Sequence, residues 1–150
     1  MSSPDSVQEP SLVLTKFQDQ LLDHAIKVNL PRTITAAQFL RLLPTSTADS
    51  PAFQFPALRN WLFKLLKNFK LQENEQHPYH KNPYRLRAID VQAVDWFWKS
   101  ADGQDGKLGF MKIQAKIETD PYLHPDSNKV EPDWLPGAVF LRGGSVAMLV

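Results

Sequence analysis

The 150-residue sequence predicts an α+β fold with a helical front and a strand-rich back. In two stretches of the front half, 14–26 and 58–69, apolar residues recur at the three- and four-residue spacing of an amphipathic helix. From Arg85 onward, apolar and polar residues alternate, which is typical of half-buried strands. The change of period therefore predicts helices first and a sheet afterwards.

The bulk composition excludes several classes of protein. The hydrophobic fraction of 43% and the charged fraction of 22% are those of a globular domain, and a net charge of +1 provides no field that would attract nucleic acid. The absence of cysteine excludes disulfides and thiolate metal sites, and it agrees with a reducing compartment. No apolar run approaches the ~18 residues of a membrane span. We therefore expect a cytoplasmic protein with no membrane span and no nucleic-acid partner.

The front of the chain divides into a leader and a helical extension. Residues 1–10 are polar and contain two prolines, which predicts a disordered leader rather than a signal or transit peptide. We expect a helical extension over 11–84. Its first helix would use one apolar face, formed by Leu14, Phe17, Leu21, Leu22, Ala25 and Ile26.

Two further helices are predicted in this extension. Thr35 and Gln38 have the spacing of a capping box, which predicts a short helix that ends by Leu43, and a loop over 45–56 follows. The next helix, over 58–70, combines an apolar stripe with a basic opposite face. Such helices can lie on acidic membranes, but a stripe of this width is also typical of a helix docked on a core, and we favour the docked helix.

The connector after this helix contains a weak metal motif. His77 and His80 have the spacing of a metal-binding pair, with Glu73 and Glu75 nearby. Prolines within and after the pair argue against the helix that would aim both imidazoles at one ion. We therefore interpret these residues as loop histidines and predict no metal site in the chain.

The back of the chain predicts a β-hairpin over 85–120. Apolar residues alternate up to Ala93 and continue on the opposite parity from Val94, which indicates a bulge near 93–95. Two Asp-Gly pairs in 102–106 predict the turn. A loop is expected over 121–134, rich in Pro, Asp and Asn. In 135–150, two apolar runs flank Arg-Gly-Gly, which is typical of strands.

The sequence contains no recognisable catalytic motif, so we predict no catalytic residue within it. Trp96 and Trp98 of the hairpin could form a plate on which a base stacks, or they could be packing residues, which is the commoner role. Gly143 and Gly144 beside Arg142 could let a phosphate approach the backbone, or they could form a bulge. Trp96, Trp98 and Arg142 are therefore the residues that would contact a ligand if these interpretations hold.

Three segments of the back half resemble the region that precedes the catalytic core of Nudix hydrolases, and most of all the fungal and plant ADP-sugar diphosphatase type. In order along the chain they are 91–97 (VQAVDWF), 106–117 (GKLGFMKIQAKI) and 136–150 (PGAVFLRGGSVAMLV). The resemblance spans about 85–150, and the front of the chain, with Trp61-Leu62 in its helix, resembles the less regular N-terminal extension of those proteins. The resemblance depends on the order of these three segments along the chain.

The resemblance implies an enzyme that hydrolyses the pyrophosphate of nucleoside diphosphate sugars such as ADP-sugars or ADP-ribose. It also implies Mg²⁺, held by the glutamates of the Nudix box, and strands that help to form a homodimer and to hold the nucleotide. Trp96, Trp98 and Arg142 are the candidate substrate-binding residues on those strands. The sequence departs from this pattern, because it contains no Arg-Glu-x-x-Glu-Glu. No metal ligand of the family can therefore be assigned to a residue of this chain.

We expect from the resemblance that the chain is the N-terminal part of such an enzyme, truncated at the start of a Nudix-like mixed sheet over 135–150, and inactive alone. The alternative is a non-catalytic module that binds a partner, or dimerises, through its open final strand. Whether the chain is itself an enzyme stays open at this point.

Overall fold

The architecture is known from a computed structural model, which describes residues 11–17, 20–43, 55–102, 106–135, 137–142 and 145–149. The leader predicted over 1–10, most of the loop predicted over 45–56, and Gly143 and Gly144 lie outside these residues. The elements, in chain order, are β1 (Ser11–Phe17), β2 (Gln20–Asn29), α1 (Ala36–Leu40), α2 (Pro56–Lys70), the 3₁₀ turn η2 (Leu71–Glu73), β3 (Tyr84–Lys99), β4 (Gly106–Thr119), β5 (Tyr122–His124), β6 (Lys129–Glu131), β7 (Trp134–Leu135), β8 (Ala138–Arg142) and β9 (Ser145–Leu149).

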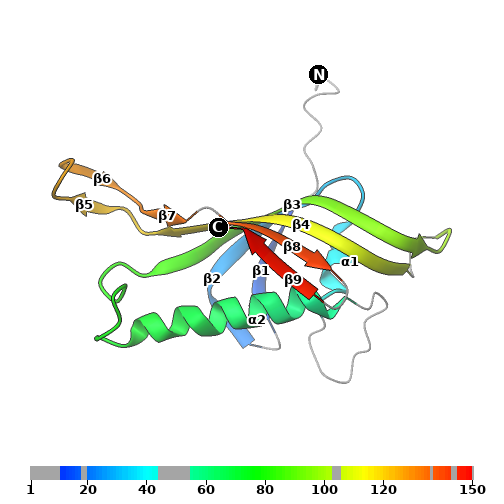
Figure 1. Ribbon diagram of the computed structural model, residues 1–150, viewed down its shortest axis with the longest axis horizontal. Helices are drawn as coiled ribbons and strands as arrows, with labels where there is room; N and C mark the ends of the chain where they lie inside the picture. The colour runs from blue at the N-terminus through cyan, green and yellow to red at the C-terminus, as the bar shows by residue number, and fades with distance from the viewer. Residues whose placement is uncertain are drawn as a thin grey trace, which may run out of the picture.

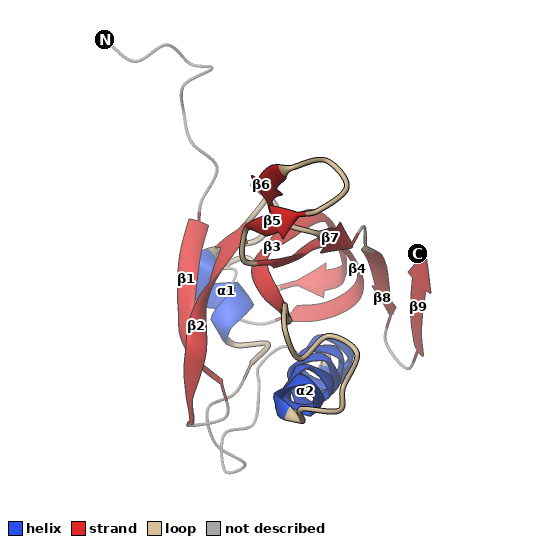
Figure 2. Ribbon diagram, turned by 90° about the vertical axis from the view of Figure 1, so that its left-hand side faces the viewer, coloured by secondary structure: helices blue, strands red, loops and turns tan. Residues whose placement is uncertain are grey.

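Most of the strands join one mixed sheet, in the order β1-β2-β3-β4-β8-β9, and β7 pairs with β4 off this path. Neighbouring strands are antiparallel except β2 and β3, which are parallel. The sheet curves around α2, while β5 and β6 form a separate hairpin that projects away from it (Figure 1, Figure 2). The predicted α+β class is confirmed, and strands predominate over helices within the described ranges.

The first predicted helix is wrong, because the stretch 14–26 forms the β1–β2 hairpin. The pairing register shifts between Leu14 and Lys16, so β1 contains an irregularity of the bulge type. As a result Leu14 and Phe17, three residues apart, are both buried, and their spacing imitates that of a helix. In β2 the buried residues Ile26 and Val28 flank the exposed Lys27, and this two-residue spacing is typical of a strand.

The two later helices are confirmed. The Thr35 amide donates to Gln38 Oε1 at 2.9 Å and the Gln38 amide donates to Thr35 Oγ1 at 3.1 Å, which completes the capping box of α1. This helix ends at Leu40, earlier than predicted, and turns follow. In α2, Pro56 occupies the first turn, where its missing N–H costs no hydrogen bond.

The predicted hairpin is also confirmed, as the long strands β3 and β4. A register shift between Val91 and Ala93 lies close to the predicted bulge, and further shifts occur on both sides of Trp96. The predicted loop over 121–134 is wrong in part, because it contains the β5–β6 hairpin. Asn128 enables its turn with a φ of 55°, a left-handed conformation that Asn tolerates.

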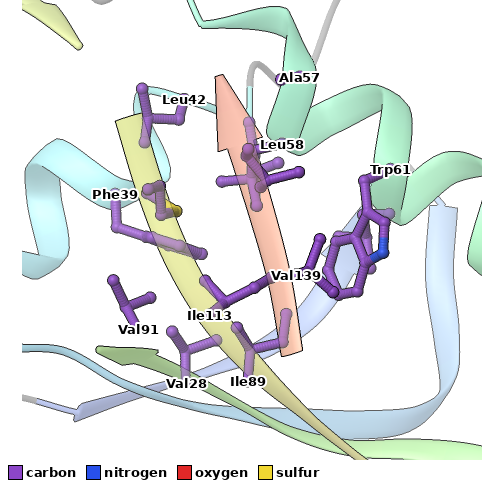
Figure 3. Packing of buried hydrophobic residues seen from close by; sticks show 14 of the residues in the cluster. Val28, Phe39, Leu42, Ala57, Leu58, Trp61, Ile89, Val91, Ile113 and Val139 are labelled. Atoms are coloured by element: carbon purple, nitrogen blue, oxygen red, sulfur yellow. The ribbon is translucent and has the colours of Figure 1, made fainter. Parts of the chain in front are cut away.

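The core lies between α2 and the concave face of the sheet. Leu58 and Trp61 of α2 lie beside Val139 of β8, and residues of β2, β3 and β4 extend the same cluster (Figure 3). Phe39 and Leu42, from α1 and the turn after it, close its end (Figure 3). Because inward residues alternate with outward ones along each strand, the opposite face of β3, β4 and β8 faces away from α2.

Candidate functional site

The structure gives the two candidate tryptophans different environments. Trp96 is half-buried against the core, and its Nε1 donates a hydrogen bond to the Thr33 carbonyl at 3.0 Å. Trp98 is 55% exposed. The cause is an extra residue in β3: Trp96 lies opposite Leu108 and Trp98 lies opposite Lys107, so Phe97 is a bulge. Trp96 is therefore a packing residue, and Trp98 remains available to a ligand.

Phe97 extends the exposed aromatic surface beside Trp98. Its side chain is 64% exposed, and its ring covers Gly109 so closely that a Cβ at Gly109 would lie 2.2 Å from Phe97 Cε1. The ammonium of Lys107 lies 5.8 Å from the centre of the same ring. Glycine at 109 thus lets the ring lie flat on the backbone of β4.

Arg142 lies on the same outward face, one strand further along. It is exposed and pairs with Phe110 of β4, and cross-strand partners project on the same side of a sheet. The rings of Phe110 and Phe140 are 5.9 Å apart between centroids, and Lys112 Nζ lies 5.7 Å from the Phe140 ring. Arg142 therefore lies beside Phe110, whose ring contacts that of Phe140 on the same face.

Together these residues form a surface that we call the aromatic face: Phe97, Trp98, Phe110, Phe140 and Arg142. It spans β3, β4 and β8 on the side away from α2. Lys107, opposite Trp98, and Phe110, opposite Arg142, are three residues apart on β4, or about 10 Å along the strand. Exposed rings can stack on a planar base, and a guanidinium can hold a phosphate. The arrangement can therefore bind and orient a nucleotide.

The described residues do not fit the magnesium that the resemblance implies. They include no cluster of three or more His, Asp or Glu side chains that could hold a metal ion. Glu118 is engaged by Arg87, with Arg87 Nε and Glu118 Oε1 3.7 Å apart. Glu73 ends the turn after α2 and Glu131 lies on the projecting hairpin, so these carboxylates do not converge.

The two loop histidines also serve the local chain rather than a common site. His77 Nδ1 accepts a hydrogen bond from the Tyr79 amide at 3.1 Å, and His80 Nδ1 lies 2.9 Å from the Gln72 carbonyl. Each ring thus contacts a backbone group of the same connector.

The electrostatic features with shifted pKa values lie at the other end of the sheet. A hydrogen bond from Arg87 lowers the pKa of Asp120, and the nearby charge of Arg85, 3.2 Å away, acts in the same direction. A hydrogen bond to Asp133 raises the pKa of Tyr122 to about 12. Asp120 thus contacts two arginines of β3, and Tyr122 of β5 contacts Asp133, which follows β6, so we assign both groups a structural role.

No family model, curated protein or solved structure matches this chain. The family resemblance thus stays a hypothesis. Across the described ranges, no helix is long and apolar enough to cross a membrane.

The structure adds Phe97, Phe110 and Phe140 to the candidates that the sequence provided. One signal could have found Phe110, since it precedes Lys112, Gln114 and Lys116 at the outward parity of β4. The exposure of Phe97 follows from its bulge, and alternation alone would have placed its ring on the opposite side from Trp98.

Proposed function

We propose that this chain is the N-terminal part of a Nudix-type hydrolase that cleaves the pyrophosphate of ADP-sugars or ADP-ribose, and that its aromatic face holds the nucleotide. One observation carries the proposal. The three segments that bear the resemblance form β3, β4 and β8–β9, which are consecutive in the sheet. Segments that are separate in the sequence are thus neighbours in the sheet. The exposed aromatic residues and Arg142 lie on the surface that they share.

Each residue of the aromatic face has a defined part in this proposal. Trp98 stacks on the adenine, with Phe97 beside it, and Arg142 contacts the pyrophosphate. None of the 150 residues is assigned to the magnesium, which the resemblance places on the glutamates of the Nudix box. It includes a cytoplasmic location, which agrees with a sequence free of cysteine, and pairing of two copies in a homodimer.

The binding part of the proposal is tested by calorimetric titration of the chain with AMP and with ADP-ribose. Trp98→Ala should weaken binding of both about tenfold, because stacking of one base on an aromatic ring contributes on the order of 1–3 kcal/mol. Arg142→Ser should weaken the binding of ADP-ribose but not that of adenosine, titrated as a third ligand, because adenosine carries no phosphate.

Trp134→Ala is the matched control, because Trp134 is 66% exposed on β7 and pairs with Glu118, near the far end of β4. It should leave both affinities unchanged. Absence of binding at millimolar AMP, or an equal loss in the Trp134 variant, would refute a nucleotide site on the aromatic face.

The catalytic part of the proposal predicts no AMP release when the purified chain is incubated with ADP-ribose and magnesium. Turnover that co-purifies with the chain, and that falls in the Trp98 variant, would show that these 150 residues contain the catalytic centre. The assignment as an N-terminal part would then be wrong.

A second function is favoured by the position of β9, which is the outermost strand on one side of the sheet. The chain could bind a partner, or a second copy, by pairing along β9, since an outer strand presents unpaired backbone groups. This predicts slow hydrogen exchange at the amides of 145–149 in a monodisperse assembly. Fast exchange of all five amides would exclude it.

A further inference from the structure

A groove of about 660 Å³ lies between the second half of α2, the end of the β1–β2 hairpin and the first residues of β3. This volume is in the range of sites that bind small molecules. The apolar part of its lining comes from both walls and includes Phe17, Leu21, Leu22, Phe63, Leu66 and Phe69.

Several of these apolar side chains are in contact with solvent. Leu21 is 75% exposed and Phe63 is 46% exposed, one on each wall. Leu66 and Phe69, further along α2 than Phe63, are half-buried. A chain of methylene groups in the groove would cover this surface, and its burial would be favourable by the hydrophobic effect.

The charged residues of the groove are mainly basic. Lys67, Lys70 and Arg85 line it together with two acids, Asp23 and Glu73. Arg85 is already paired with Asp120. Within the described part of the chain, Lys67 and Lys70 make no ion pair, so two ammonium groups on adjacent turns of α2 are available to an anion at the edge of the apolar lining.

We propose that this groove binds a long-chain fatty acid, with its alkyl chain along Phe63, Leu66 and Phe69 and its carboxylate at Lys67 and Lys70. A recessed apolar lining of small-molecule size, beside two cations that no described carboxylate pairs with, fits a single-chain anionic amphiphile. The inference rests on the groove alone and is independent of the nucleotide site.

The test is calorimetric titration of the full chain with octanoate, decanoate and dodecanoate below their micellar concentrations. Binding should be one to one, and two additional methylenes should tighten it about tenfold, because each buried methylene corresponds to up to about fourfold in Kd. Dodecan-1-ol, which lacks the carboxylate, should bind about tenfold more weakly than dodecanoate.

Variants of α2 locate the ligand. Phe63→Ser should weaken dodecanoate binding at least fivefold, and this partly exposed residue can be changed without opening the core. The double variant Lys67→Ser and Lys70→Ser should reduce the preference for dodecanoate over dodecan-1-ol. Lys64→Ser is the matched control, because Lys64 is exposed on the same helix but does not line the groove.

Three results would overturn the proposal. The first is an affinity for the fatty acids that does not depend on the length of their alkyl chain. The second is a loss of dodecanoate binding in the Lys64 variant that equals the loss in the Phe63 variant. The third is binding to phosphatidylserine-containing vesicles with none to monomeric dodecanoate, which would indicate a membrane-surface helix instead. In that case, added salt would strongly weaken the binding of the chain to the vesicles, because the attraction between α2 and the anionic lipids would be screened.

Discussion

The side-chain amide of Gln72 forms hydrogen bonds with both backbone polar groups of Tyr84, twelve residues further along the chain. Gln72 Nε2 donates to the Tyr84 carbonyl at 3.0 Å, and Gln72 Oε1 accepts from the Tyr84 amide at 2.8 Å. Gln72 is only 5% exposed. One side chain thus replaces a strand partner at the first residue of β3 and fixes the end of α2 to the start of the central hairpin.

Gln72→Ala should therefore destabilise the protein by about 2 kcal/mol, because it leaves two polar backbone groups without partners in a partly buried site. The free energy of unfolding in urea measures the loss. Gln76→Ala, in the same connector but exposed, should change stability by less than about 0.5 kcal/mol. Equal effects of the two changes would mean that the contact of Gln72 with Tyr84 contributes nothing specific.

The capping box of α1 provides a second prediction. Thr35→Ala removes the side-chain acceptor for the Gln38 amide and should cost about 1 kcal/mol, while Thr35→Ser should retain most of the stability. Thermal unfolding followed by circular dichroism resolves a difference of this size. Thr33→Ala is the control, because only the backbone carbonyl of Thr33 contacts Trp96. A Thr33 variant less stable than the Thr35 variant would contradict the capping role.

Two adjacent residues of α2 should lose very different amounts of stability on the same truncation. Leu62 is fully buried, so Leu62→Ala should cost about 3 kcal/mol through lost burial and the cavity that remains. Phe63 is 46% exposed in the groove, so Phe63→Ala should cost less than about 1 kcal/mol. Chemical denaturation of both variants tests this, and similar losses would show that α2 is rotated relative to the sheet.

The ionisation of Tyr122 should be visible in the ultraviolet titration of the protein. The hydrogen bond to Asp133 raises its pKa to about 12, from the usual value of about 10. Since the neutral phenol is the favoured form, this contribution to stability is complete below pH ~10 and is lost as the pH rises towards ~12. Asp133→Asn should return the pKa towards 10.

The tyrosine that titrates late is identified by Tyr122→Phe, which should remove that step from the absorbance curve. Tyr84 provides a comparison, because burial also raises its pKa, with Asp133 contributing. A late step that persists unchanged in the Tyr122 variant would assign it to Tyr84 and contradict the hydrogen bond to Asp133 as the main cause.

The sequence predicted elements well where local rules decide the structure. The capping box of α1, the stripe of α2 and the alternation of β4 each depend on neighbours within a few residues, and all three are confirmed. It failed for β1, where an irregularity places Leu14 and Phe17 on one side with helical spacing. Short strands such as β5 contain too few residues for any period.

The candidate site was predictable only in part, because it too depends on an irregularity in a strand. Trp98 and Arg142 are exposed as a ligand site requires, but the bulge at Phe97 separates Trp98 from Trp96. Strand pairing then brings Phe110 beside Arg142, which lies thirty-two positions later (142 − 110). Neither bulge position nor pairing register can be obtained from one strand by itself, because both depend on its partner.

The parallel junction between β2 and β3 comprises only three residue pairs, from Lys27↔Ala88 to Asn29↔Asp90, whereas β3 and β4 pair along almost their whole length. The hairpin β1–β2 is therefore the part of the sheet that can detach as a cooperative unit while β3, β4 and β8 stay folded. Hydrogen exchange should show two classes of amide, with the β1–β2 class opening at lower free energy. Because this hairpin forms one wall of the groove, a ligand bound there would slow exchange across β1 and β2 and leave β4 unaffected.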